Sequence, residues 1–532
     1  MNSVHSLLQP PKQELVGGPH EVRGVILTHK LPERLRKGSI WILWVILGAV
    51  IFINILSQWA ASTTLLLELQ YSFRITRRNS EQISRGMILS NVFATLAFGR
   101  LADVRSRHAA SGLALLFFVV GCIMCAASTN STTFAAGAVF HSIGNGGLRL
   151  LSTLFIADYT SLKWRGAALS WTYLPSLVMI WLRPRISITM SWRWTYGMVI
   201  IIMSFLCGPA LYMLFSATRN TYTAPSLPNS QLMKFKNLVS RMDPIGLSIF
   251  TLGFALIEYN SDPAFTSIIA DKYPPGRIAK LTIGLLFAFP IFIVWELYGT
   301  SFPLMPRRVL QRKGMLFAIM INFLFWLASI FPVAAVKDFM PFVLWNSNDL
   351  GLLLSTSAIA YNASAPLLGL VYYFTQRYKP FLCLGSVLFA LGCALWVHVA
   401  RDWDFTVADE LPASAAYLFT IQALIGFGII AVDMGTLISA QASVAHDDLA
   451  TVTALLAVSS QLATSVGNVV GTASSVLDGA TRSVVWLSLA LGLSILCLFL
   501  SLFVPNYILG NEHSAAEVER REEQDSLESQ SK

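Results

Sequence analysis

Repeated apolar windows, each about 20 residues long, constrain this chain more than any other feature of its sequence. A helix of that length crosses the hydrocarbon core of a bilayer. Because lipid offers no hydrogen-bond partner to a bare backbone, each window is expected to be helical. We therefore predict an all-α membrane protein with about fourteen transmembrane helices. The windows are 41–67, 83–102, 109–128, 134–157, 164–182, 194–215, 243–259, 279–298, 315–335, 350–374, 380–399, 414–438, 449–472 and 483–504.

The composition agrees with a membrane protein and argues against several other classes. Hydrophobic residues make up 55% of the chain and charged residues only 13%, whereas soluble proteins carry roughly a quarter charged residues. The net charge of +9 is explained by loop lysines and arginines facing an anionic leaflet, so we expect no nucleic-acid partner. No GxxxxGK nucleotide loop or HExxH zinc motif occurs, and we predict neither a cofactor, a resident metal nor an enzyme.

The distribution of basic residues sets the expected orientation. An even number of helices places both termini on one side, and the excess of Lys and Arg puts that side in the cytoplasm. The sequon at Asn130 then lies outside, which predicts glycosylation there. The expected organisation is an N-terminal tail (1–40), a six-helix bundle (41–215), a cytoplasmic loop (216–242), two inserted helices (243–298), a basic linker (299–314), a second six-helix bundle (315–504) and an acidic, disordered tail (505–532).

An internal repeat supports the division into two bundles. The segment that connects the second and third predicted helices contains Gly99 and, eight residues later, Arg107. The segment that connects the tenth and eleventh contains Gly369 and Arg377 with the same separation. An apolar helix follows directly in both cases. Such repeats are typical of secondary transporters, whose substrate site lies between the two related halves.

A polar stripe runs through one of the most apolar windows, in the stretch Phe134–Gly166. His141, Asn145 and Arg149 recur every fourth residue, which stacks them along one helical face. Because an arginine at mid-membrane depth costs about 2.5–3.5 kcal/mol, it must face a bundle interior or a wet cavity. The stripe either bonds to a neighbouring helix or lines a transport pathway, together with Tyr361 and Asn362.

Three carboxyl groups are also predicted to lie at membrane depth. Asp433 stands in the middle of its window, whereas Glu258 and Glu296 stand near the ends of the inserted helices. A carboxyl group in a low-dielectric interior is suited to carry a proton, and Asp433 is the preferred candidate. The alternative is a purely structural partner for another polar group. Without a nucleotide loop, transport would draw its energy from a solute or ion gradient.

The loop from Gly99 to His108 resembles the signature between helices two and three of the major facilitator superfamily. Gly99, Asp103 and Arg107 match that signature. The resemblance implies a major facilitator fold in which Asp103 and Arg107 form a latch on the cytoplasmic face that holds the outward-open state. Gly369 and Arg377 occupy the corresponding positions of the second half.

Two longer blocks, Phe134–Gly166 and Ser439–Ala473, resemble the fungal siderophore–iron transporters, which belong to the fourteen-helix drug:proton antiporter-like branch. The resemblance implies proton-coupled import of a ferric siderophore by a monomer in a fungal plasma membrane, with endosomal and vacuolar membranes as alternatives. The short last external loop, 474–482, instead favours proton-coupled efflux of a drug or secondary metabolite. A non-transporting nutrient sensor on the same fold is a third interpretation.

Overall fold

The computed structural model describes residues 48–58, 69–189, 191–219, 239–259, 275–339, 347–402, 414–473 and 479–511. Every regular element in these ranges is helical, which confirms the all-α prediction for this part of the chain. Eight of the described helices are long and apolar enough to cross a membrane. The chain is therefore an integral, multi-pass membrane protein, and the expected number of fourteen helices stays a prediction.

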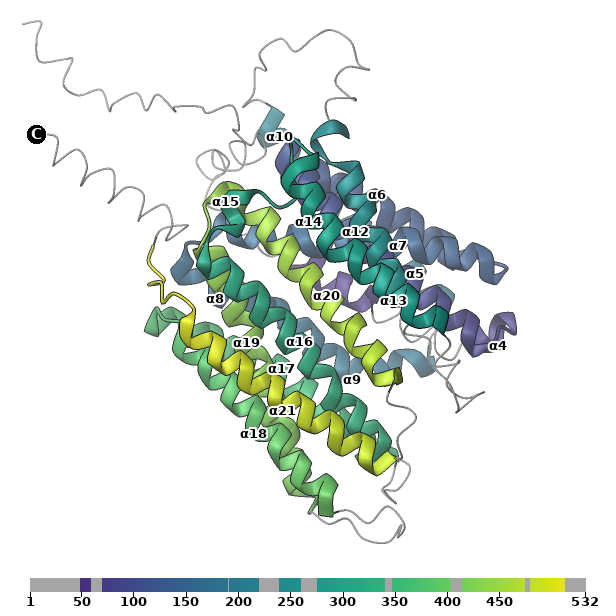
Figure 1. The fold of residues 1–532 in the computed structure, drawn as a ribbon. Coiled ribbons are helices and arrows are strands. Elements are labelled where there is room, and N and C mark those ends of the chain that lie inside the picture. The colour runs from purple at the N-terminus through teal and green to yellow at the C-terminus, as the bar shows by residue number, and fades with distance from the viewer. Residues whose placement is uncertain are drawn as a thin grey trace, which may run out of the picture.

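The first half of the chain forms a group of long helices that pack on one another (Figure 1). α7 packs along both α5 and α6, and α10 packs on α6. The fifth predicted window is not one straight helix, because a turn of 3-10 helix separates α8 from α9. The elements are a helix at 48–58, α4 (Leu69–Phe73), α5 (Arg77–Val104), α6 (Arg107–Ala126), α7 (Ser131–Tyr159), α8 (Leu162–Ser170), η2 (Trp171–Tyr173), α9 (Leu174–Thr189) and α10 (Trp192–Arg219).

A pair of helices and a short connection follow. The second helix of the pair contains Pro290, which removes a backbone donor, and a π-helical turn surrounds it. α12 packs on its partner and also on α5 and α20, so the pair lies against helices from both halves of the chain. The elements are α12 (Pro244–Tyr259), α13 (Pro275–Leu286), η4 (Phe287–Ile291), α14 (Phe292–Val294), η5 (Trp295–Gly299) and α15 (Arg307–Leu310).

The second half forms another helical group, with its own hydrophobic core. Phe325, Phe389 and Trp396 are fully buried in that core. α18 packs on α19 and α21, and α16 packs on α20 and α21. The elements are α16 (Lys313–Phe339), α17 (Ser347–Thr375), α18 (Lys379–Asp402), α19 (Ala415–Ala442), η7 (His446–Asp448), α20 (Leu449–Ala473) and α21 (Gly479–Phe503).

The segment after α21 differs from the prediction of a disordered tail beginning at residue 505. Residues 505–511 are packed: the amide of Leu509 donates to the carbonyl of Gln376 (3.0 Å), and the carbonyl of Gly510 accepts from the amide of Lys163 (2.9 Å). Leu509 is fully buried, and this apolar anchor explains the order. The segment thereby joins the end of α17 to the start of α8. The remainder of the predicted tail lies outside the described residues.

Two of the helix pairs that join the halves are α5 with α20 and α8 with α17. Each pair contains one glycine of the sequence repeat. A Cβ on Gly99 would lie 3.2 Å from the Cβ of Ala454, and a Cβ on Gly369 would lie 2.8 Å from the carbonyl oxygen of Gly166. The repeated glycines therefore allow the halves to approach closely at both crossings, which is a structural reason for both.

The Gly369→Ala variant tests this role. We expect it to lower the free energy of unfolding by about 1–3 kcal/mol, because the new methyl group overpacks the α8–α17 crossing. Gly351→Ala is the matched control on the same helix, since nothing lies within 4 Å of its Cβ position. That change should be neutral or stabilising by up to about 1 kcal/mol. Equal shifts in the thermal unfolding midpoints of both variants would contradict this account.

Candidate functional site

A central cavity of about 440 Å³ lies between the two halves. The helix at 48–58, α5, α7, η2 and α9 line it from the first half, and α16, α17, α19 and α20 line it from the second. Its wall is rich in polar side chains although it lies among apolar helices. These polar residues are Asn54, Gln58, Thr95, Arg149, Ser152, Thr153, Thr172, Tyr173, Ser176, Asn322, Tyr361, Asn362, Asp433, Thr436, Thr453, Ser460, Gln461 and Thr464.

Asp433 is held at the cavity wall by three hydrogen-bond donors. The hydroxyls of Tyr173 and Tyr361 donate to its Oδ2 (3.1 and 2.9 Å), and Nε1 of Trp326 donates to its Oδ1 (3.3 Å). Three donors around one carboxyl group suit an ionised form that accepts bonds from all of them. Since Tyr173 comes from the first half and Asp433 from the second, this contact also joins the halves across the cavity.

A glycine on α19 brings the partner helix close enough for this arrangement. A Cβ on Gly426 would lie 3.0 Å from the amide nitrogen of Tyr361, so α17 can approach α19 only where the side chain is absent. Tyr361 then reaches Asp433 two turns further along α19. Asn362 also lines the cavity, and its Nδ2 donates to the carbonyl of Ala358 in its own helix (2.8 Å).

Arg149 lines the same cavity from α7. Its guanidinium donates to Oδ1 of Asn91 on α5 (3.3 Å). Among the residues that the structure describes, no carboxylate forms an ion pair with Arg149, and Asp433 is an acidic group that attracts it electrostatically. Both interpretations of the polar stripe thus apply to this residue, because it bonds a neighbouring helix and also faces a cavity.

His141 and Asn145 lie outside the lining of the cavity, in contrast to the expectation for the stripe. His141 is 1% exposed, contacts Ser57, and stands 5.0 Å from the ring of Phe118 on α6. The physical reason is the pitch of the helix. Residues four apart are rotated by about 40°, so Arg149 is turned by about 80° from His141. The stripe therefore turns from the α6 contact toward the cavity.

Glu258 and Glu296, the carboxyl groups of the two inserted helices, also lie outside the lining of the cavity. Glu258 is buried at the end of α12, beside Ser465 of α20. Glu296 accepts a hydrogen bond from the amide of Met305 (2.7 Å), with Asp243 and Arg100 nearby. Both are buried where α12 and η5 pack on the rest of the protein, which favours structural roles for them.

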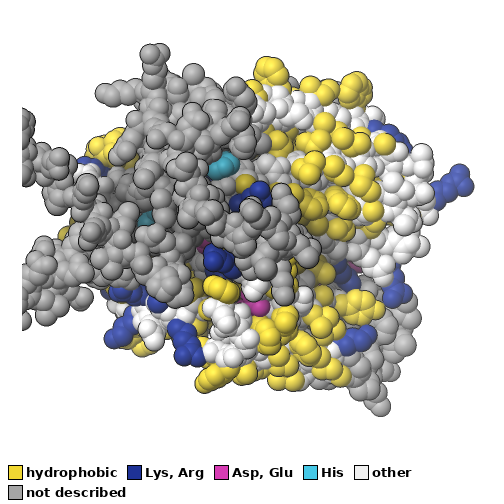
Figure 2. All heavy atoms as spheres, turned by 90° about the horizontal axis from the view of Figure 1, so that it is seen from above, with side chains coloured by type: hydrophobic (Ala, Val, Ile, Leu, Met, Phe, Trp, Pro, Cys, Tyr) yellow, Lys and Arg dark blue, Asp and Glu magenta, His cyan; other side chains and the backbone are white. Residues whose placement is uncertain are grey.

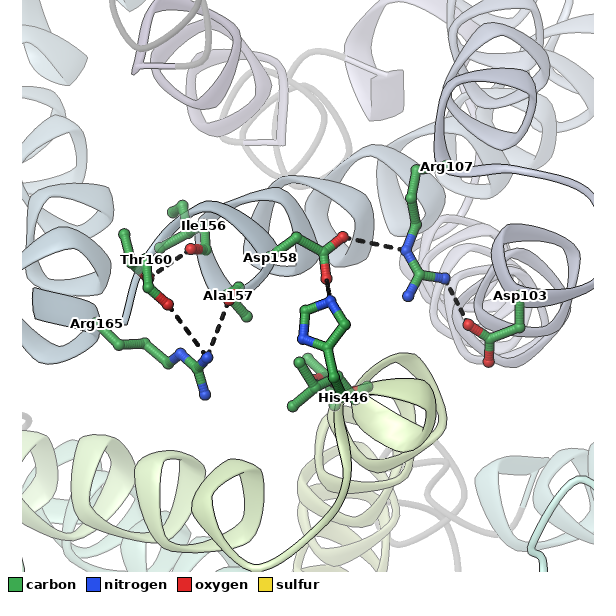
Figure 3. A network of polar contacts seen from close by, with 10 residues as sticks. Asp103, Arg107, Ile156, Ala157, Asp158, Thr160, Arg165 and His446 are labelled. Atoms are coloured by element: carbon green, nitrogen blue, oxygen red, sulfur yellow. Dashed lines mark hydrogen bonds and ion pairs between the residues drawn. The ribbon is translucent and has the colours of Figure 1, made fainter. Parts of the chain in front are cut away.

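A network of buried polar residues joins the two halves (Figure 3). Arg107 donates through its guanidinium to Asp103 and to Oδ2 of Asp158 (3.2 Å). The other oxygen of Asp158 stands 3.4 Å from Nε2 of His446. We name these four residues the Asp158 cluster. Asp158 belongs to α7 and His446 to η7, so the cluster links the first half to the second.

The cluster combines predicted and unpredicted residues. Asp103 and Arg107 were expected to pair, and they do so while only 4% and 2% exposed. Asp158 and His446 were not among the predicted site residues; the local signal for Asp158 was an acidic residue directly after the apolar window 134–157. Arg377, the repeat partner of Arg107, is exposed, and among the described residues no acidic side chain pairs with it.

Asn130 lies at the opposite end of α7 and is exposed. Its Oδ1 accepts from the amide of Thr133 (2.7 Å), which caps the helix. A capping bond through the oxygen leaves the amide nitrogen free for a glycan. Glycosylation at this position stays a prediction.

The Asp158→Ala variant should destabilise this end of the protein strongly. It leaves Arg107 with one partner and removes the carboxylate beside His446, and breaking a buried ion pair costs about 3–5 kcal/mol. Lys163→Gln is the control, because it removes a more exposed contact between the halves at the same end, Lys163 over the ring of Tyr373 (5.0 Å). That contact contributes about 0.5–1 kcal/mol. Thermal unfolding of detergent-purified variants separates the two costs; shifts of equal size would contradict the role of Asp158.

Comparison with known proteins adds an independent observation. No protein-family model matches the chain. A siderophore transporter of Zymoseptoria tritici is 27% identical over 70% of this chain, and a siderophore iron transporter of Schizosaccharomyces pombe is 28% identical over 67%. The chain is therefore similar to fungal siderophore transporters over about two thirds of its length. A low affinity heme transporter of Schizosaccharomyces pombe is similar as well, at 28% identity over 73% of the chain.

The similarity extends over only part of these relatives. The three aligned regions cover 59%, 57% and 61% of those proteins, so the chain spans about three fifths of the length of the curated relatives it matches. Solved structures show the same fold. One is a bacterial homologue of the iron transporter ferroportin in an outward-facing state, which matches this chain with a TM-score of 0.56 and 11% sequence identity. The match covers 86% of this chain and 98% of that chain. A POT peptide transporter has a TM-score of 0.57, with 13% identity, 87% and 94% covered.

Proposed function

We propose that this chain is a secondary active transporter that carries a ferric siderophore through the central cavity. The observation that carries the proposal is a cavity of about 440 Å³ that both halves line with polar side chains, Arg149 and Asp433 among them. A site between two related halves, reached alternately from each side, is the general design of such carriers. The named relatives are described as transporters, which supports a carrier over an enzyme.

Proton coupling at Asp433 is the second part of the proposal. This carboxyl group lies in the cavity wall, whereas Glu258 and Glu296 do not. Binding of a proton would remove its charge and change its bonds to Tyr173 of the first half and Tyr361 of the second. Protonation would therefore be coupled to the relative position of the halves, which is what a proton-driven carrier requires.

The membrane arrangement is proposed from the sequence together with the fold. It comprises fourteen helices, both termini in the cytoplasm and a monomer in the fungal plasma membrane, and the excess of Lys and Arg in the expected inner loops supports this orientation. With this orientation the Asp158 cluster lies at the cytoplasmic end. The cavity would then be reached from outside, as import requires.

Uptake by yeast cells that lack their own iron-uptake systems tests the function. Cells that express the chain should accumulate iron supplied as a ferrichrome-type chelate, and a protonophore should prevent the accumulation. Chelate that leaves preloaded cells faster, without uptake, would support the efflux alternative suggested by the short loop at 474–482. Transport in neither direction, with the chain present in the membrane, would contradict the proposal.

A further inference from the structure

A second, smaller cavity lies at the end of the bundle that carries α15. Its volume is about 290 Å³. Arg308, Gln311 and Arg312 line it on one side, and η7 with the residues before it lines the other, through Asp448. It belongs neither to the central cavity nor to the Asp158 cluster.

The cavity carries an excess of positive charge. Arg308 is 50% exposed and forms an ion pair with Asp448 (2.7 Å), which leaves Arg312 as the second cation in the wall. Arg307 and Lys313 are exposed beside it. Seen from above, Lys and Arg side chains lie near the centre of the molecule, and acidic side chains occupy only small areas of the described surface (Figure 2).

The position of this cavity relative to the membrane follows from the helices that begin there. Two membrane-crossing helices start at Lys313 and at Leu449, each directly after residues that line the cavity. The cavity therefore lies at the level where lipid headgroups meet water. The N-terminal ends of both helices point toward it, and their partial positive charge favours an anion.

We propose that this cavity binds a phosphate group, as carried by a phosphoinositide headgroup or by a soluble phosphate compound. Two guanidinium groups match the oxygens of a phosphomonoester, which is nearly dianionic at neutral pH. Basic pockets at the membrane surface are typical sites for such headgroups. The phosphate would take the place of the Asp448 carboxylate on Arg308. The proposal does not depend on what the central cavity transports.

Binding of a short-chain phosphatidylinositol 4-phosphate to the purified full-length chain tests the site. The Arg308→Gln, Arg312→Gln double variant should bind this lipid at least about tenfold more weakly than the unmodified chain. The Arg307→Gln, Lys313→Gln double variant is the matched control, because it removes the same charge outside the cavity. Arg307 donates to the carbonyl of Leu297 and stands over the ring of Tyr298 (5.7 Å). The affinity of this control variant for the lipid should stay within about twofold of that of the unmodified chain.

A soluble inositol phosphate with the same headgroup distinguishes the two sources. Binding that is at least about tenfold tighter for the lipid assigns the site to the membrane, and equal binding assigns it to a soluble compound. Both results support a phosphate site. An equal loss of affinity in the two double variants, or no measurable binding to the unmodified chain, overturns it. If the two double variants have the same thermal unfolding midpoint, misfolding is excluded as the cause of a difference in their affinities.

Discussion

Uptake by the Asp433→Asn variant is expected to fall to the level of cells without the chain, and to lose its dependence on external pH. The substitution keeps the shape of the side chain but removes the group that would exchange a proton. It also places an amide where two tyrosine hydroxyls and an indole nitrogen all donate. Uptake of labelled ferric chelate at about pH 5 and about pH 7 measures the effect, with faster uptake by the unmodified chain at the lower pH.

Glu258→Gln is the control for this experiment. It is the same chemical change, carboxyl to amide, at a buried site outside the cavity lining. We expect this variant to keep its pH dependence. If Asp433→Asn shows unchanged uptake across the same pH range, or if Glu258→Gln abolishes the dependence instead, Asp433 is not the proton carrier. Size-exclusion profiles of both variants confirm insertion and folding.

The second large effect is expected at Arg149. Loss of its guanidinium removes a cation from the cavity wall, and hydrogen bonds to charged groups contribute about 1.5–3 kcal/mol. If Arg149 pairs with the substrate, Arg149→Ala should raise the apparent KM for uptake by roughly ten- to hundredfold. Arg149→Lys should recover part of this loss, because it keeps the charge but not the planar fork.

Arg105→Ala controls for the loss of one positive charge. Arg105 is exposed beyond the end of α5 and does not line the cavity. The apparent KM of the Arg105→Ala variant for uptake should match that of the unmodified chain. Normal kinetics of Arg149→Ala would show that its bond to Asn91 is its whole role, as the structural interpretation of the stripe holds.

Several features of the site followed from the sequence because their cause is local. A charged or polar side chain inside an apolar window must avoid lipid, and this argument alone directed Arg149 and Asp433 toward the interior. The same argument could not separate His141 from Arg149. The rotation of successive turns and the contact with α6 decide which of the two reaches the cavity.

The remaining features depend on contacts between distant parts of the chain. Tyr173 and His446 are ordinary residues in their own segments, and only the packing of the halves brings them to Asp433 and Asp158. The packed segment 505–511 is a similar case. Its polar neighbours suggested disorder, whereas burial of Leu509 and two backbone bonds, to Gln376 just after α17 and to Lys163 of α8, hold it in place.

The central claim, proton-driven movement of a ferric chelate through the cavity, is tested most directly in liposomes. The purified chain is reconstituted with an acidic exterior, and the iron of an added chelate is followed into the vesicles. We expect accumulation above the external concentration, loss of this accumulation with a protonophore, and no accumulation with Asp433→Asn. Equilibration without accumulation, unaffected by the proton gradient, would contradict it.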